Sequence, residues 1–296
     1  MPLPSPAERR KGALLMLCAS LLFSSGGLLV REVRSASPWD IVFWRSAFMF
    51  GFLTLVLLVW HGRGLAGRLR LLGRSGLVSA VFMGSTFVLF VMAVSHTTVA
   101  NTAALMSTSP LVLALAGRAF LGEHPPAGIW LAVAAALAGI GLMFSEGLGP
   151  GAMLGNLCAL GVPLAFAVNY VVLRRAGQHV DPVVMMLIAA LFAMLAALPF
   201  AAPLSVPTAD FPALAALGVL QTGAACLLLA LAMRRLTAVE LSLISLVEPV
   251  LTPLWVWLVL AERPGQAALA GGVMVVAAVL ASQLLVLIRE RGSPSR

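Results

Sequence analysis

The chain has 296 residues and a net charge of +8; 61% of its residues are hydrophobic and 10% are charged. This composition is far too apolar for a water-soluble domain of that length. The basic residues are spread along the chain and do not gather in one patch, so they do not indicate a nucleic-acid partner.

Ten apolar stretches, each about 18–22 residues long, follow one another along the chain. As α-helices, stretches of this length cross a hydrocarbon layer of roughly 30 Å. They lack the polar–apolar alternation of a transmembrane barrel, and inside lipid the backbone must satisfy its own hydrogen bonds. The sequence therefore predicts an all-α integral membrane protein with ten transmembrane helices. The predicted spans are residues 12–30, 41–60, 76–95, 99–118, 128–145, 152–172, 183–202, 212–232, 239–260 and 266–288.

The first span follows three basic residues, Arg9, Arg10 and Lys11, as the apolar core of a signal peptide does. It is as long as a full span and no cleavage site leads into a soluble domain, so we expect a retained helix. With a cytoplasmic N-terminus, 15 of the 19 Lys and Arg residues fall on the cytoplasmic side and three fall outside. This bias follows the positive-inside rule and predicts that both termini are cytoplasmic. The expected location is a bacterial inner membrane, which the chain crosses many times.

One block of the sequence occurs twice. Pro110 recurs as Pro249 and Glu123 recurs as Glu262, in each case 139 residues later. Each copy belongs to a predicted half with five spans, and because five is odd the second half would enter the membrane in the opposite direction. The sequence therefore predicts two inverted five-helix repeats. The predicted halves and the cytoplasmic tail are residues 1–145, 151–288 and 289–296.

The fifth and tenth spans are rich in Ala and Gly and carry no polar stripe. Small residues let helices approach each other closely in a membrane. We expect these two spans to lie away from any transport pathway, either as packing helices or as the contact of a homodimer.

Glu248 is the clearest functional candidate, because an ionisable side chain inside a span is costly and rare. It lies near the middle of the ninth span, directly before Pro249. A proline leaves the carbonyl four residues earlier without its helical partner, so the carbonyl of Ser245 would add a second polar group. Glu248 is predicted to bind substrate or to couple transport to protons. The alternative is a protonated side chain bonded to its own helix.

Prolines inside three spans are predicted to act as hinges, where the helix bends or opens. Pro110 lies in the fourth span, Pro163 in the sixth, and Pro249 and Pro253 in the ninth. By the same reasoning, Pro110 leaves the carbonyl of Met106 free.

The other candidates are polar or aromatic side chains that form stripes on single spans and would meet if each stripe faced one central cavity. For each Ser or Thr the alternative is a hydrogen bond to its own helix or a neighbour. The predicted substrate-binding or cavity-lining residues are Ser24, Trp44, Thr86, Asn101, Thr108, Pro163, Asn169, Tyr170, Gln221, Ser245 and Glu248.

Arg45 lies about five residues into the second span and has two interpretations. Its side chain either reaches an outer cavity and meets a substrate carboxylate, or extends to the outer membrane surface and pairs with Asp40. We favour the second. A direct pair of Arg45 with Glu248 is not expected, since helix rise places the two at depths that differ by roughly 10 Å.

The repeated block also carries a family likeness. Its first copy reads Thr98, Ser109–Pro110 and Leu121–Gly122–Glu123, and its second reads Thr237, Glu248–Pro249 and Leu260–Ala261–Glu262. This pattern resembles the EamA-type domain of the drug/metabolite transporter superfamily, and the resemblance covers nearly the whole chain as two such domains. It implies a ten-helix transporter with a central cavity inside spans one to four and six to nine. The nearest likeness is to bacterial exporters of aromatic and other amino acids.

Glu123 and Glu262 are strong motif residues but poor candidates for transport. Each stands two residues before a proline, Pro125 or Pro264, that can begin the next helix. A carboxylate at that place favours the positive end of the helix, so we expect both to start helices.

The leading hypothesis is a secondary transporter that exports small metabolites, most of all amino acids, by alternating access. No phosphate-binding Gly–Lys–Ser/Thr loop is present, so ATP is not the direct energy source. Proton coupling and facilitated diffusion are both open. One alternative is a proton-coupled exporter of cationic drugs, and an alternative from another class is an intramembrane enzyme.

The three cysteines lie in different spans and make neither a disulfide framework nor a metal site. We therefore expect no cofactor, no metal and no catalytic residue. The expected partners are a small-molecule substrate and the lipid bilayer.

Overall fold

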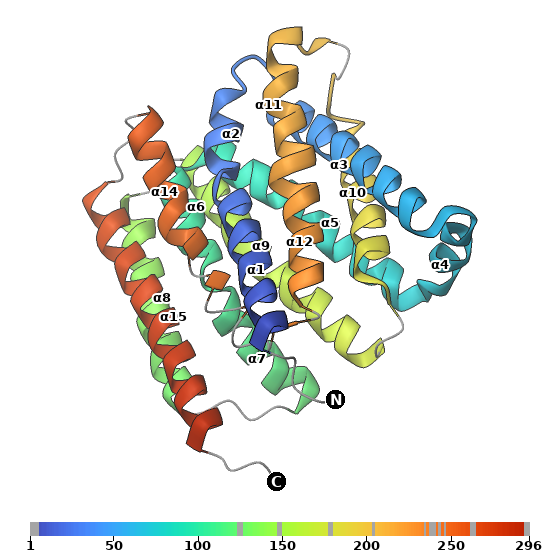
Figure 1. The fold of residues 1–296 in the computed structure, drawn as a ribbon. Helices are drawn as coiled ribbons and strands as arrows, with labels where there is room; N and C mark the ends of the chain where they lie inside the picture. The colour runs from blue at the N-terminus through green and yellow to red at the C-terminus, as the bar shows by residue number, and fades with distance from the viewer. Residues whose placement is uncertain are drawn as a thin grey trace.

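A computed structural model of the chain describes residues 6–122, 127–146, 150–176, 180–202, 205–233, 235–236, 241, 244–245, 247–260 and 265–292. Every regular element in these ranges is helical (Figure 1). Within them, six helical stretches are long and apolar enough to cross a membrane, and three shorter apolar helices accompany them. The count of ten spans and the inversion of the halves stay predictions. The motif residues Glu123, Pro125, Thr237, Glu262 and Pro264 lie outside the described residues.

The described helices come in the following order. In the first half they are α1 (Pro6–Ser24), α2 (Gly26–Glu32), α3 (Pro38–His61), the short turn η1 (Gly62–Gly64), α4 (Leu65–Leu71), α5 (Gly73–His96), α6 (Val99–Met106), α7 (Ser109–Leu121) and α8 (Ala127–Glu146). In the second half they are α9 (Pro150–Ala176), α10 (Pro182–Ala197), the turn η3 (Thr208–Asp210), α11 (Phe211–Ala215), the π-helix η4 (Ala216–Ala224), α12 (Ala225–Ala232), α14 (Val247–Leu260) and α15 (Gln266–Gly292).

Two helices begin at matching positions of the two halves. Before α3, the Ser37 hydroxyl accepts the N–H of Asp40 at 3.2 Å, and the Asp40 carboxylate accepts the N–H of Ser37 at 3.1 Å. Before α10, the Asp181 carboxylate accepts the N–H of Val183 at 3.0 Å. Each helix has a proline in its first turn. A side-chain cap followed by proline satisfies orphan N–H groups and sets the helical φ angle, so these pairs fix where the helices start.

The predicted fourth span is divided into two helices. Helix α6 ends at Met106 and α7 begins at Ser109, with Pro110 in its first turn. The Ser109 hydroxyl donates to the Met106 carbonyl at 2.6 Å, which gives a partner to the carbonyl that proline leaves free. By contrast, Pro163 lies inside the continuous helix α9.

The remaining hinge candidates, Pro249 and Pro253, are helical residues of α14. Their side chains lie outside the described part of the structure.

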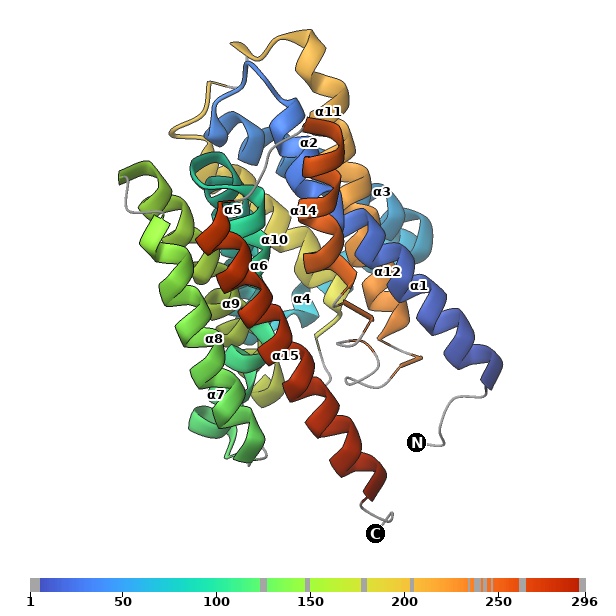
Figure 2. The same ribbon diagram turned by 90° about the vertical axis from the view of Figure 1, so that its left-hand side faces the viewer.

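The helices form a bundle whose outer surface is apolar. Helix α5 packs along α9 and α10, α10 also packs on α3, and α1 packs on α12 and α14. Helix α1 begins and α15 ends at the same end of the bundle (Figures 1 and 2). On the outside, Val59, Leu71 and Leu131 are 74–77% exposed, as a surface in contact with lipid tails requires.

The small residues of α8 and α15 serve the contact between these two helices, which lie side by side at one edge of the bundle (Figures 1 and 2). A Cβ atom on Gly139 would lie only 2.7 Å from the carbonyl oxygen of Gly271. This agrees with the packing interpretation of the fifth and tenth spans. A homodimer contact through them stays a prediction.

Helix α3 and the π-helix η4 are held unusually close by Gly218. A Cβ atom there would lie 2.5 Å from the Cβ of Phe48 and 3.0 Å from the backbone nitrogen of Met49. No longer side chain fits between these two backbones. Gly218 therefore sets the separation of α3 and η4, which both contribute to the site described below.

We expect Gly218→Ala to lower the free energy of unfolding by about 1–3 kcal/mol, because the added methyl group overpacks the contact of η4 with α3. The matched control is Gly51→Ala on α3, where a Cβ atom meets nothing within 4 Å. Gly51→Ala should leave stability unchanged or raise it by up to about 1 kcal/mol. Denaturant unfolding of both purified variants in the same detergent measures the difference. Equal stability of the two variants would contradict the tight contact.

Candidate transport site

Arg45 lies in the interior of the bundle, where its side chain is 4% exposed. Its Nε donates to the Thr222 hydroxyl of η4 at 2.9 Å, and its Nη1 donates to the Phe87 carbonyl of α5 at 3.1 Å. No carboxylate among the described residues pairs with it.

The interpretation favoured from the sequence, that Arg45 extends to the outer surface and pairs with Asp40, is wrong. The Asp40 carboxylate instead accepts the N–H groups of Ser37 and Ala202. The physical reason is that α5 and η4 bring two acceptors, the Phe87 carbonyl and the Thr222 hydroxyl, within hydrogen-bonding distance of the guanidinium group. Its hydrogen bonds are therefore made inside the bundle and not at the membrane surface.

Two aromatic rings of α5 also face the Arg45 guanidinium group. Its central carbon lies 5.5 Å from the ring centroid of Phe87 and 5.3 Å from that of Phe90. At such distances the negative faces of aromatic rings attract a cation, by about 0.5–2 kcal/mol depending on solvent access. The rings therefore compensate part of the charge that the described carboxylates leave unpaired.

The Thr222 hydroxyl joins Arg45 to further polar groups. Its oxygen lies 2.7 Å from Oε1 of Gln221 and 2.9 Å from the Leu217 carbonyl, so its single proton has two acceptors. The amide of Gln221 donates in turn to the Phe23 carbonyl of α1 at 3.4 Å. We call Arg45, Phe87, Phe90, Gln221 and Thr222 the Arg45 cluster.

The break between α1 and α2 lies beside this cluster. Helix α1 ends at Ser24, whose hydroxyl donates to the Leu21 carbonyl at 2.8 Å and accepts the indole N–H of Trp255 at 3.0 Å. A Cβ atom on Gly26, at the beginning of α2, would lie 2.7 Å from the Gln221 amide nitrogen. The predicted residues Ser24 and Gln221 are thus brought to the same place, together with Trp255 of α14.

Glu248 lies in the first turn of α14 and is partly buried. The described residues show no direct ion pair between Glu248 and Arg45. Arg45 on α3 and Glu248 on α14 thus come from different helices and are not in contact within the described structure.

A second buried cluster joins α6 to α9. The Thr97 hydroxyl donates to Oδ1 of Asn156 at 2.8 Å, and the Asn101 amide donates to Thr97 Oγ1 at 3.3 Å. Oδ1 of Asn101 and Nδ2 of Asn156 are buried without a partner in the described part of the chain. We call Thr97, Asn101 and Asn156 the Asn101 cluster; it is separate from the Arg45 cluster.

Other predicted residues take different places. Asn169 of α9 accepts the Ser79 hydroxyl of α5. Thr86 donates to the Met83 carbonyl of its own helix at 2.6 Å, and Thr108, in the turn between α6 and α7, donates to the Leu105 carbonyl of the neighbouring α6 at 2.7 Å. Both follow the alternative given above for such residues.

The remaining predicted residues are Trp44, Pro163, Tyr170 and Ser245. The ring of Trp44 packs against those of Phe43, Phe48 and Phe211. Pro163 and Tyr170 lie on α9, and Ser245 lies two residues before α14.

Sequence reasoning missed Phe87 and Trp255 as partners within the site. No sequence signal marks a π-helix, and it is η4 that carries Gln221 and Thr222 toward α1 and α3. The available signal was Arg45 itself, an arginine inside an apolar span, for which an inward position was the less favoured interpretation. Among the described residues, no three His, Cys, Asp or Glu side chains lie together as metal ligands would.

Comparison with known proteins agrees with this architecture. The pattern of the EamA-like transporter family matches the sequence twice, over residues 10–145 and over residues 153–283. The chain belongs to the EamA-like transporter family. It is therefore a multi-pass membrane protein that transports small molecules, and the members of its family are transporters rather than enzymes.

No curated protein matches the chain. One protein of known crystal structure is similar to it over 94% of this chain and 98% of that chain, with 20% sequence identity and a TM-score of 0.67. At that identity the likeness concerns the fold alone.

We expect Thr222→Val to lower the free energy of unfolding by about 1–3 kcal/mol, because it leaves the buried Nε of Arg45 without an acceptor. Thr86→Val is the control, since its hydroxyl bonds only to its own helix in the described structure. That change should stay within about 1 kcal/mol of the wild type. Denaturant unfolding in detergent distinguishes the two, and an equal effect of both substitutions would contradict a role for Thr222 in holding Arg45.

Proposed function

We propose that this EamA-like transporter exports amino acids, aromatic ones included, by alternating access, and that the Arg45 cluster binds the substrate carboxylate. The observation that carries this proposal is a guanidinium group buried to 4% exposure with no carboxylate partner among the described residues. A buried charge costs several kcal/mol unless an opposite charge meets it. A planar guanidinium group with five N–H donors suits a carboxylate, and two of its nitrogens have protein partners here.

The acidic side chain of Glu248 supports an amino acid, rather than a simple carboxylate, as the substrate. Glu248 is a partly buried acidic residue of α14, a helix different from that of Arg45, and Trp255 of the same α14 donates to Ser24 beside the Arg45 cluster. An α-amino acid carries a carboxylate and an ammonium group only a few bonds apart. In this proposal the ammonium group is attracted to Glu248 while the carboxylate binds Arg45.

Aromatic rings beside the cluster support substrates with apolar or aromatic side chains. Phe87 and Phe90 face Arg45, and Trp255 is anchored on Ser24 near Gln221. Rings packed against a substrate side chain add dispersion and apolar burial, of the order of 1 kcal/mol for each aromatic pair.

Alternating access is supported by two similar contacts between the halves of the chain. A Cβ atom on Gly12 would lie 2.8 Å from the Cβ of Arg235, and one on Gly155 would lie 2.7 Å from the backbone carbon of His96. Arg235 and His96 are 139 positions apart, the spacing of the duplicated block. The first contact involves the beginning of α1 and the end of α12, and the second involves the beginning of α9 and the end of α5, at the opposite end of the bundle (Figures 1 and 2).

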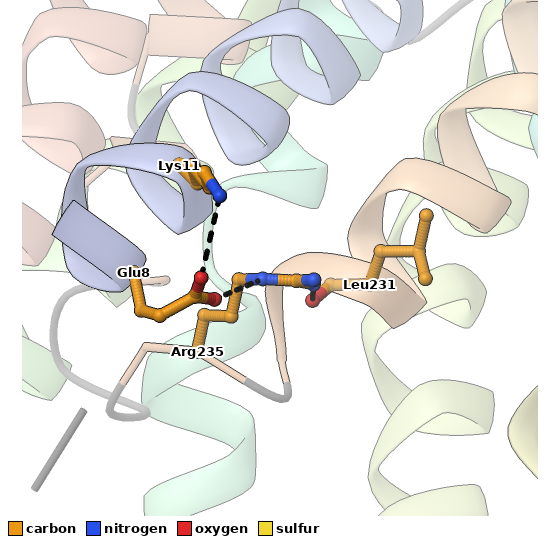
Figure 3. A network of polar contacts seen from close by, with 4 residues as sticks. All are labelled: Glu8, Lys11, Leu231 and Arg235. Carbon is orange, nitrogen blue, oxygen red and sulfur yellow. Dashed lines mark hydrogen bonds and ion pairs between the residues drawn. The ribbon is translucent and has the colours of Figure 1, made fainter. Parts of the chain in front are cut away.

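Polar bonds accompany each contact. At one end, the Glu8 carboxylate accepts from Arg235 at 2.9 Å and from Lys11 at 3.4 Å (Figure 3). At the other, Thr97 donates to Asn156 at 2.8 Å, and Arg31 donates to the Thr97 carbonyl at 3.0 Å. A path to either side of the membrane would open if one contact separated while the other held. From the distribution of charges, we propose that the Glu8–Arg235 end faces the cytoplasm.

The substrate proposal predicts how analogues of phenylalanine will behave in proteoliposomes. Phenylethylamine lacks the carboxylate and phenylpropionate lacks the ammonium group. Wild-type protein should move phenylalanine best. Arg45→Gln should lower kcat/KM for phenylalanine at least about tenfold while leaving phenylethylamine nearly unaffected, because it removes the charged partner of the carboxylate. Glu248→Gln should lower kcat/KM for phenylalanine while leaving phenylpropionate nearly unaffected, because it removes the charged partner of the ammonium group. Uptake of labelled solutes, with and without a pH gradient, gives the rates.

The control for Arg45→Gln is Arg70→Gln. This change removes an exposed arginine of α4, a helix that contributes no residue to the Arg45 cluster. Equal losses for all three solutes in Arg45→Gln would mean that Arg45 is structural. Movement of cationic dyes without amino acids would favour the drug-export alternative. If no solute moves at all, the chain does not act as a transporter in this form.

Alternating access predicts that joining the Glu8–Arg235 contact stops transport. In a variant freed of the native cysteines, Glu8→Cys with Arg235→Cys should be cross-linked by a short, reducible reagent. Transport should fall to background and return after reduction, because the cytoplasmic path can no longer open. A membrane-impermeant reagent should act only from the cytoplasmic face.

Each single cysteine variant, treated in the same way, is the control and should retain transport. Full activity of the cross-linked double variant would refute a moving contact at this end. Reaction from the outside alone would reverse the proposed orientation.

A further inference from the structure

An apolar groove of about 490 Å³ runs along the outside of the bundle between α1 and the beginning of α14. Arg10, Ala13, Leu14 and Leu17 line one wall, at spacings of three and four residues that place them on one face of α1. Ile244 and Val247 line the other wall. The groove is thus formed by α1 of the first half and by residues at and just before the beginning of α14 in the second half.

The lining that the structure describes is apolar except for Arg10, which is the lining residue nearest the beginning of α1. Leu14 and Leu17 are 63% and 38% exposed, although α14 packs beside them. From Arg10 to Leu17 is seven residues, or about 10 Å along the helix axis. The described lining therefore runs along α1 from a cation to apolar side chains.

The basic residues around the beginning of α1 differ in what they bind. The Glu8 carboxylate binds both Lys11 and Arg235, and Arg235 also donates to the Leu231 carbonyl at 2.8 Å (Figure 3). Arg10 is exposed and has no ion pair or hydrogen bond within the described part of the chain. Its guanidinium group is therefore available to an anion beside the groove.

We propose that this groove is a binding site for an anionic phospholipid, with the phosphate against Arg10 and one acyl chain along Ala13, Leu14, Leu17, Ile244 and Val247. A guanidinium group matches phosphate oxygens in geometry and charge. The other lining residues that the structure describes offer only apolar contact, which suits a hydrocarbon chain.

A transported polar solute does not fit this groove. A small-molecule site of similar size carries several convergent polar groups, whereas Arg10 is the one polar residue among the lining residues that the structure describes. The groove also opens on the lipid-facing side of α1, where Leu14 is exposed. A charge beside an apolar surface suits a phospholipid lying in a membrane.

Such a lipid would lie across the seam between the two halves. Helix α1 contacts α14, and Val247 in the wall of the groove directly precedes Glu248. A bound acyl chain would fill space between helices that belong to different halves. The inference concerns a lipid site and stands whether or not the transported solute is an amino acid.

Native mass spectrometry of the purified full-length chain tests the site. The protein is titrated with phosphatidylglycerol and, separately, with phosphatidylcholine of the same acyl chains. Wild-type protein should retain phosphatidylglycerol in preference. Arg10→Gln should weaken phosphatidylglycerol binding about fivefold and leave phosphatidylcholine binding unchanged, the factor expected for one basic residue near an anionic headgroup. Arg10→Lys, which keeps the charge, should retain most of the preference.

Two further variants separate the groove from general surface charge. Leu14→Trp should reduce binding of both lipids at this site, since the larger side chain fills the groove. Arg70→Gln, which removes an exposed arginine elsewhere, should bind like the wild type. Melting temperatures in detergent establish that each variant is folded.

The proposal fails if Arg10→Gln and Arg70→Gln bind phosphatidylglycerol equally, which would mean non-specific attraction. It also fails if Leu14→Trp keeps wild-type binding of both lipids. Competition by inorganic phosphate or glycerol phosphate as strong as that by the intact lipid would identify a free phosphate as the ligand and overturn the lipid assignment.

Discussion

Keeping a guanidinium group inside an apolar helical bundle is the constraint on which the centre of this protein depends. In a membrane an unpaired charge costs several kcal/mol. Here the Arg45 side chain is held by the Thr222 hydroxyl, the Phe87 carbonyl and two aromatic rings. These partners come from α5 and η4, so both must lie close to α3. The close approach of η4 in turn requires Gly218, because any side chain there would meet the backbone of α3.

Interrupted helices provide the polar groups that surround this charge. The break between α1 and α2 brings Ser24 and the Phe23 carbonyl toward Gln221, and the π-helix η4 presents Gln221 and Thr222 in sequence. Non-helical backbone inside a membrane is tolerated only where protein or a cavity satisfies its hydrogen bonds. In α6 and α7 that role falls to Ser109, which binds the free carbonyl of Met106. Each helix break or π-helical turn thus exposes polar groups, and nearby side chains provide hydrogen-bond partners for them.

At the contact between Gly12 and Arg235 the two halves of the chain pack closely, but the ion pair beside this contact contributes little stability. Glu8 and Arg235 are 42% and 31% exposed, and an ion pair so open to solvent contributes only about 0–1 kcal/mol. The glycine contacts beside it are close, yet they form no covalent or buried ionic bond. Interfaces of this kind can separate at modest cost, which suits a protein whose proposed cycle opens one end at a time. The groove between α1 and α14 lies on the same seam, so a lipid bound there would act on the same separation.

The sequence by itself determined the class of the protein. Apolar stretches of span length, the bias of Lys and Arg and the repeated Ser/Glu–Pro block led to a helical membrane transporter of the EamA type, and the family match agrees. Helix starts at Ser37–Pro38 and Asp181–Pro182 could also be predicted, because a cap and a proline act on their immediate neighbours.

Only the tertiary structure decided the direction of Arg45, the division of the polar residues between the Arg45 and Asn101 clusters, and the π-helix. Each depends on groups distant in the chain: Arg45 turns inward because Thr222, 177 residues away, offers an acceptor. Local pattern gives the face on which a residue lies. Which partner that face meets is set by packing between helices, and no local pattern encodes it.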